Sequence, residues 1–181
     1  MNEYLLSDTL KHLTGPSKEQ IIVNNQWASV AFGKYHANNI VKIKLLVNEG
    51  NEHFQLKLES SFSKAAMKEE KYMAFHGAES LAWFLMSVLN GYKYLSQSEI
   101  GEGCDYRFYK DIPNDANLNF LSEEFEFIEI SGIMEESKTN TIRIRLKQKH
   151  LQLTKGTKRD EPSSIIVSLF KQPTIVKVKH K

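Results

Sequence analysis

The first 60 residues contain short runs of alternating apolar and polar positions, a pattern that is typical of β-strands. The clearest runs are Ile40–Leu45 and Phe54–Leu58, which lie on either side of a turn-forming Asn-Glu-Gly-Asn segment and predict a hairpin. Two earlier runs, Ile21–Val23 and Trp27–Phe32, are rich in β-branched and aromatic residues and also favour strands. We therefore predict an N-terminal antiparallel β meander.

The pattern becomes helical in residues 64–90, where Ala, Met, Lys, Glu and Leu dominate. From Ala78 to Leu89 this stretch is apolar almost all round, which predicts a helix buried at the centre of its domain. Gly77 is predicted to divide the region into two helices. Asn90 and Gly91 are typical of a helix C-terminus.

The second half of the chain combines strands with one further helix. Two periods compete in residues 141–153. Ile142, Ile144 and Leu146 alternate as in a strand, whereas helical spacing relates Ile142, Leu146, Lys149 and Leu153. Both interpretations fit the pattern, and we predict the helix. Strands are predicted at Tyr92–Leu95, Cys104–Lys110, Phe125–Ile130, Ser164–Phe170 and Thr174–Lys179.

Composition favours a single folded domain. Of the 181 residues, 41% are hydrophobic and 25% are charged, and the only cysteine, Cys104, excludes a disulfide framework within the chain. We predict a mixed α/β (α+β) domain over residues 1–181, with a β-rich subregion at 1–60 and an α/β core at 61–181. The sequence has neither a long apolar run nor the pattern of a secretory signal, so we expect no membrane segment and a cytoplasmic location. The Lys- and Asn-rich composition indicates a bacterial source.

The charge is divided unequally along the chain. Residues 1–137 carry 12 Lys/Arg and 20 Asp/Glu, whereas residues 138–181 carry 12 and 2, so the net charges are −8 and +10. Either the two parts pack together and neutralise each other, or the segment Lys138–Lys181 binds nucleic acid or an acidic protein surface. Phe170 is the only aromatic residue of that segment, so nucleic acid would be contacted mainly through its phosphates, in a salt-sensitive manner.

Three carboxylates are the main candidates for chemistry, because phosphate-binding loops and zinc-ligand spacings are missing from the sequence. Glu79 lies near the start of the buried helix, Asp105 on the following strand and Glu129 on a later one. Strand alternation places Glu129 in an apolar row with Phe125 and Phe127, where an ionised carboxylate is costly unless it is paired or metal-bound. Converging carboxylates suit Mg²⁺, which can activate a water for phosphodiester cleavage.

The order of these elements resembles the core of the PD-(D/E)xK nuclease superfamily, which contains restriction-type and DNA-repair nucleases. That core consists of a helix, three strands, a helix and a strand, and the resemblance covers about residues 74–170. It implies a restriction-endonuclease-like core within the mixed sheet.

The same resemblance implies roles for individual residues. Glu79 matches the helix carboxylate, Asp105 the motif aspartate and Glu129 the acidic residue of the half-motif. Ser131 stands where the motif has its lysine. Lys147 on the following helix is the candidate for a lysine that has moved to another element.

Two functions follow from these observations. The first is a Mg²⁺-dependent nuclease in which Glu79, Asp105 and Glu129 hold the metal and Lys147 stabilises the charge that develops on the phosphate. The second is a non-catalytic subunit of a larger bacterial assembly, or a homo-oligomer, that binds nucleic acid or an acidic protein through Lys138–Lys181.

Simpler structural roles remain open for the same residues. Glu79 could stabilise a helix N-terminus through the helix dipole, and Asp105 could pair with Arg107 or with a basic residue of the C-terminal segment. Glu129 could face an arginine of the segment 143–149. In that case the fold would be kept without the activity.

Overall fold

The computed structural model describes residues 1–48, 50–59, 69–112, 124–158 and 160–180. Its strands are β1 (Glu3–Leu5), β2 (Ile40–Val47), β3 (Gly50–Lys57), β4 (Tyr94–Gln97), β5 (Tyr106–Tyr109), β6 (Phe125–Ile133), β7 (Ser163–Leu169) and β8 (Thr174–Lys179). Its helices are η1 (Leu6–Asp8), α1 (Thr9–His12), α2 (Lys18–Gly33), α3 (Glu70–Phe84), the π-helical continuation η3 (Leu85–Leu89) and α4 (Ile142–Lys155). The predicted mixed α/β class is confirmed.

The eight strands form one mixed sheet in the order β1-β3-β2-β8-β7-β6-β5-β4. Strands β4, β5 and β6 are antiparallel neighbours, and β7 lies parallel to β6. Helix α4 makes the crossover between β6 and β7, so α3, β4, β5, β6, α4 and β7 follow one another along the chain. The N-terminal hairpin joins this sheet because β2 pairs in parallel with β8.

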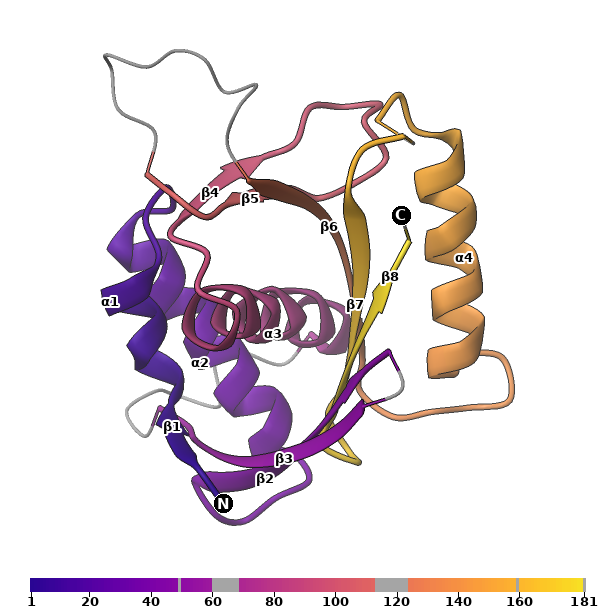
Figure 1. Ribbon diagram of the computed structural model, residues 1–181. Coiled ribbons are helices and arrows are strands. Elements are labelled where there is room, and N and C mark those ends of the chain that lie inside the picture. Colours follow the sequence, from indigo (N-terminus) through magenta and orange to yellow (C-terminus); the bar gives the residue numbers. More distant parts are fainter. Residues whose placement is uncertain (49, 60–68, 113–123, 159, 181) are drawn as a thin grey trace.

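The sheet is strongly curved, with α2 and α3 on its concave side and α4 against the opposite face (Figure 1). Two groups of buried apolar side chains result. The larger lies between the concave face, α2 and α3. The smaller lies under α4 and contains Ile133, Leu153, Ile165, Val167 and Leu169. Side chains that alternate along β6 therefore face two different environments.

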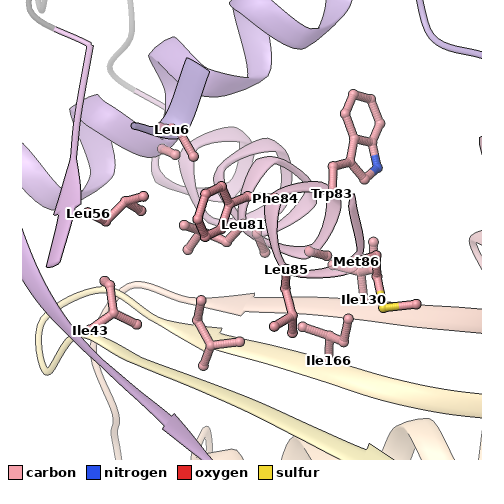
Figure 2. Close-up of a cluster of buried hydrophobic side chains, with 14 of the residues drawn as sticks. Leu6, Ile43, Leu56, Leu81, Trp83, Phe84, Leu85, Met86, Ile130 and Ile166 are labelled. Atoms are coloured by element: carbon pink, nitrogen blue, oxygen red, sulfur yellow. The ribbon is translucent and has the colours of Figure 1, made fainter. Parts of the chain in front are cut away.

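The predicted central helix is confirmed over the described residues. In Figure 2, Leu85 of the α3–η3 helix extends toward the sheet, where Ile166 lies, and all three residues Leu81, Leu85 and Ile166 are buried. The predicted division at Gly77 is wrong. A Cβ atom at this position would lie 2.8 Å from the ring of Phe170, so the glycine serves close packing within a continuous helix. Residues 64–68 of the predicted helix lie outside the described residues.

The predicted N-terminal meander is wrong for residues 18–33, which form α2. Ser17 begins this helix, because its side-chain oxygen accepts a hydrogen bond from the backbone N–H of Gln20 at 3.1 Å. The buried positions of α2 include two asparagines, Asn24 and Asn25. The apolar residues alone therefore do not show the helical spacing of the buried face. Asn25 is buried. Its amide nitrogen donates a hydrogen bond to the backbone oxygen of Leu6 at 3.4 Å, and its amide oxygen accepts one from the hydroxyl of Ser80 at 2.7 Å.

Of the predicted meander, the hairpin of β2 and β3 is confirmed, with Ile43 opposite Phe54 in its register. The third member of this group, β1, pairs with β3 in parallel. The meander is thus replaced by a hairpin, a parallel edge strand and a helix that covers the concave face.

In the second half of the chain, the strands β6, β7 and β8 and the helix α4 are confirmed. Thr141 caps α4, because its hydroxyl oxygen accepts a hydrogen bond from the backbone N–H of Ile144 at 3.2 Å. Strand β5 begins at Tyr106, so Cys104 and Asp105 precede it instead of belonging to it.

Candidate active site

Asp105 is held against β6 by two hydrogen bonds on either side of Glu129. Its backbone N–H donates to the carbonyl of Ile128 at 3.1 Å, and its carboxylate oxygen Oδ2 accepts from the N–H of Ile130 at 2.7 Å. A side chain thus replaces the backbone acceptor that a longer β5 would supply. This arrangement fixes the Asp105 carboxylate next to Glu129.

Glu129 is buried completely, on the face of β6 that is covered by α4. The ammonium group of Lys149, from α4, forms an ion pair with its oxygen Oε1, and Lys149 is also 3.4 Å from the amide oxygen of Gln152. The other carboxylate oxygen, Oε2, is buried and has no hydrogen-bond partner among the described residues. A buried acceptor without a partner is costly, so this oxygen is available to a ligand.

The electrostatics of the two carboxylates are coupled. Burial raises the pKa of Glu129 to about 7, and the negative charge of Asp105 adds to this effect, whereas Lys149 and the side chain of Gln152 oppose it. Burial also raises the pKa of Asp105, against the effects of the Ile130 N–H and of Lys149. Two acids therefore share a site with little water and one nearby cation.

Glu79 lies on α3 and is hydrogen-bonded from several directions. The hydroxyl of Tyr106 donates to its oxygen Oε1, and Oε2 is 2.8 Å from Nδ1 of His76 and 3.4 Å from the amide nitrogen of Asn24. Burial and the charges of Glu79 and Asp105 raise the pKa of Tyr106 far above its usual range, so its hydroxyl remains a donor. Glu79 thus fixes the positions of Tyr106 and His76.

Three adjoining cavities surround these groups. One of about 530 Å³ is lined by both Glu79 and Asp105. A larger one of about 920 Å³ is lined by Ser131 and Lys149 and shares Phe75 and His76 with the first. A third, of about 350 Å³, shares Asp105 with the first and reaches Gln152. Asp105 therefore borders two cavities, and Lys149 borders the one beyond His76.

The structure brings some of the three predicted carboxylates close together, but not all of them. The charge of Asp105 raises the pKa of Glu129, and Glu79 lines the same cavity as Asp105. In the described parts of the chain, however, no three His, Cys, Asp or Glu side chains lie close enough together to hold one metal ion. The three predicted carboxylates therefore do not form a single cluster, because Glu79 belongs to a hydrogen-bond group on α3 and β5.

The predicted lysine, Lys147, and its neighbour Lys149 lie in different surroundings on α4. Lys147 is exposed on α4, whereas Lys149 reaches Glu129. The sequence pattern could have indicated Lys149, because this residue lies between Leu146 and Leu153 on the side of α4 that packs on the sheet. Ser131 is buried on β6, and its short side chain lines the same cavity as Lys149.

The ion pair between Asp105 and Arg107 that the sequence allows is not formed. The guanidinium of Arg107 is 3.4 Å from Glu102 and lies 4.5 Å from the ring centre of Phe127. Cys104 is half-buried next to Asp105, and burial raises the pKa of its thiol to about 11. An unionised thiol of this kind is a poor nucleophile.

Comparisons with protein-family models, curated protein sequences and solved structures find no match for this chain. None of the helices in the described ranges has the length and apolar character that crossing a membrane requires.

Proposed function

We propose that this protein is a Mg²⁺-dependent nuclease-like enzyme of the PD-(D/E)xK type that acts on phosphodiester bonds. One observation carries the proposal: β6 holds Asp105 beside the buried Glu129, and Lys149 of the next helix reaches the same carboxylate. The chain order α3, β4, β5, β6, α4, β7, with β7 parallel to β6, supports it, because the superfamily core has the same succession. A cytoplasmic location and a bacterial source belong to the same proposal.

The donor set fits a hard divalent cation. Glu129 offers a buried oxygen without a hydrogen-bond partner, and Asp105 offers the oxygen Oδ1, which is not used in its bond to Ile130. Carboxylate oxygens are the ligands that Mg²⁺ prefers. Burial and the charge of Asp105 raise the pKa of Glu129, and a cation would offset both effects. Asp105 and Glu129 would hold the ion, with Glu79 on the wall of the adjoining cavity. When bound, Mg²⁺ supplies charge neutralisation and a lowered pKa for water.

The chain's own residues would orient and stabilise the substrate. The ammonium group of Lys149 would stabilise negative charge that develops on the phosphate, the role predicted for Lys147. Tyr106 and His76 are both fixed by Glu79 at the border of the 530 Å³ cavity, so Glu79 acts as a positioning residue.

Cleavage of DNA with Mg²⁺ or Mn²⁺ tests the proposal. Supercoiled, linear and single-stranded DNA should be incubated with wild type, Glu129→Gln, Lys149→Met and Lys147→Met. We expect cleavage by wild type, a loss of about 100-fold or more in Glu129→Gln and Lys149→Met, and near-normal activity in Lys147→Met. Lys147 is the matched control, because it is a lysine of the same helix that points away from Glu129.

Two results would overturn the proposal: no cleavage of any of these substrates by the wild type, or equal losses in Lys147→Met and Lys149→Met. Circular dichroism and melting curves of each variant separate loss of activity from loss of fold.

The second candidate function is a non-catalytic subunit that binds nucleic acid or an acidic protein. Part of the basic segment is already neutralised, because Lys149, Lys171 and Lys177 pair with acids of the first 137 residues. The outer face of α4 nevertheless keeps Arg143 and Lys147 exposed. Binding through this face should weaken steeply with salt and should be lost in the double variant Arg143→Glu, Lys147→Glu. An affinity that depends neither on salt nor on these two substitutions would exclude this candidate.

A further inference from the structure

An aromatic cluster lies on α2 and α3, where these helices cover the concave side of the sheet (Figure 1). His76 lies between Trp27 and Tyr72, with ring centres 6.1 Å apart on both sides and ring planes inclined by 29° and 24°. Phe75 meets His76 edge-on at 5.1 Å. Tyr72 is 54% exposed and Phe75 is 42% exposed, so aromatic surface is presented to solvent. We call these four residues the aromatic cluster.

Two residues of the aromatic cluster border both cavities of the candidate active site. Phe75 and His76 line the 530 Å³ cavity, which is also lined by Asp105, and the 920 Å³ cavity, which is also lined by Lys149. A ligand that extends from one cavity into the other therefore lies against Phe75 and His76.

The larger cavity also carries charge that suits a phosphate backbone. It is lined by the basic residues Lys34, Lys71, Arg145 and Lys149 and by the acidic residues Glu70 and Glu135. Lys34 pairs with Glu70, whereas Lys71 is exposed beside them. The guanidinium of Arg145 is oriented by a 2.7 Å hydrogen bond from Nε to the amide oxygen of Asn140, which does not involve its two Nη groups.

We propose that the substrate is single-stranded nucleic acid, which deepens the proposed function and rests on it for the chemistry of cleavage. Unpaired bases stack on Tyr72 and Phe75, and the backbone runs past Lys71 and Arg145 toward Lys149. Stacking on a side chain needs a free base face, which an unpaired strand offers and a continuous duplex covers with neighbouring bases. Aromatic faces next to cationic side chains are the combination that binds single strands without regard to sequence.

Binding can be measured without cleavage in the Glu129→Gln protein with EDTA. The probes are fluorescein-labelled oligo-dT and oligo-U of about 16 nucleotides and the corresponding dA·dT duplex, followed by fluorescence anisotropy. We expect either single strand to bind about 10-fold or more tightly than the duplex. The stronger of oligo-dT and oligo-U identifies DNA or RNA as the natural strand.

Variants of the aromatic cluster test the stacking itself. Tyr72→Leu combined with Phe75→Leu should weaken single-strand binding about 10-fold or more, whereas Tyr72→Phe should keep it, because only the latter preserves a ring. Leu151→Ala is the matched control, since Leu151 is an apolar residue of α4 that is 53% exposed and outside the cavities. Arg145→Ala should reduce the salt dependence of binding by about one phosphate contact.

Equal affinity for duplex and single strand, or equal affinities of the leucine and phenylalanine variants, would overturn the inference. The failure of the proposed function is a separate result. Selective single-strand binding without any cleavage by the wild type would reject the nuclease and keep the binding site. Cleavage of duplex that is unaffected by changes in the aromatic cluster would keep the nuclease and reject the single-strand substrate.

Discussion

Glu129 should make the folded state less stable as the pH rises, and Glu129→Gln should remove this dependence. Burial, reinforced by Asp105, raises the pKa of Glu129 from 4.5 to about 7, although Lys149 opposes the shift. The folded state therefore holds this proton more tightly than the unfolded chain. Between pH 4.5 and 7 the folded state binds more protons, so the free energy of unfolding falls with rising pH.

The expected size of this effect is about 3 kcal/mol, because each pH unit between the two pKa values corresponds to about 1.4 kcal/mol. The stability is fully present below pH 4.5 and is lost as the pH rises through 7. Domains of this size gain or lose roughly 2–4 °C in melting temperature per kcal/mol, so the change is easily measured.

Urea unfolding of wild type and Glu129→Gln from pH 4 to pH 8.5, at constant ionic strength, checks this prediction. The difference between the two proteins isolates Glu129 from other titrating groups. Relative to the glutamine variant, wild type should lose about 3 kcal/mol across this range. Above pH 7, Mg²⁺ or Mn²⁺ should restore part of the loss in wild type only, because the cation binds the ionised carboxylate.

A difference that stays constant with pH would mean that the Glu129 carboxyl has the same pKa in the folded and unfolded states. A difference that grows in favour of wild type would mean that Lys149 outweighs burial and lowers the pKa. Either result would remove the reason for placing a cation between Asp105 and Glu129.

Three further predictions concern other positions. Lys149→Met should destabilise the protein by about 3–5 kcal/mol at pH 8, because it leaves a buried carboxylate without its cation. In the control Lys147→Met, the free energy of unfolding should change by no more than about 0.5 kcal/mol, and equal values for the two variants in urea unfolding would contradict the ion pair. Gly132→Ala should cost at least about 2 kcal/mol, because its Cβ would overlap the backbone carbonyl of Ala74 where α3 crosses β6, and an unchanged melting temperature would refute this close approach. Cys104 should react with iodoacetamide at pH 8 about 100-fold more slowly than a cysteine in a short peptide, since burial raises the pKa of its thiol from 9.0 to about 11. Equal reaction rates would show that the thiol is not desolvated.

Much of the second half of the fold could be predicted from local patterns. Strands β6, β7 and β8 have runs of apolar residues, and α4 has a helical stripe that ends at Leu153. Glu129 could be singled out because a carboxylate in an apolar row needs a partner, and Asp105 because the resemblance matches it to the motif aspartate. In α2 the same reasoning failed, because Asn24 and Asn25 occupy core positions with partners that lie elsewhere in the chain.

The sequence by itself determined the helical or strand spacing of most elements and the unequal charge of residues 1–137 and 138–181. It also identified Asp105 and Glu129, the two acids beside β6. The tertiary structure decided which partners meet. Lys147 and Lys149 differ by about 200° around one helix axis, so the seating of α4 on the sheet selects Lys149 for Glu129. In the same way, the packing of α2 against α3 assembles the aromatic cluster from Trp27 and Tyr72. A local period specifies the conformation of one element, whereas contacts between distant residues depend on how whole elements pack, which no single segment encodes.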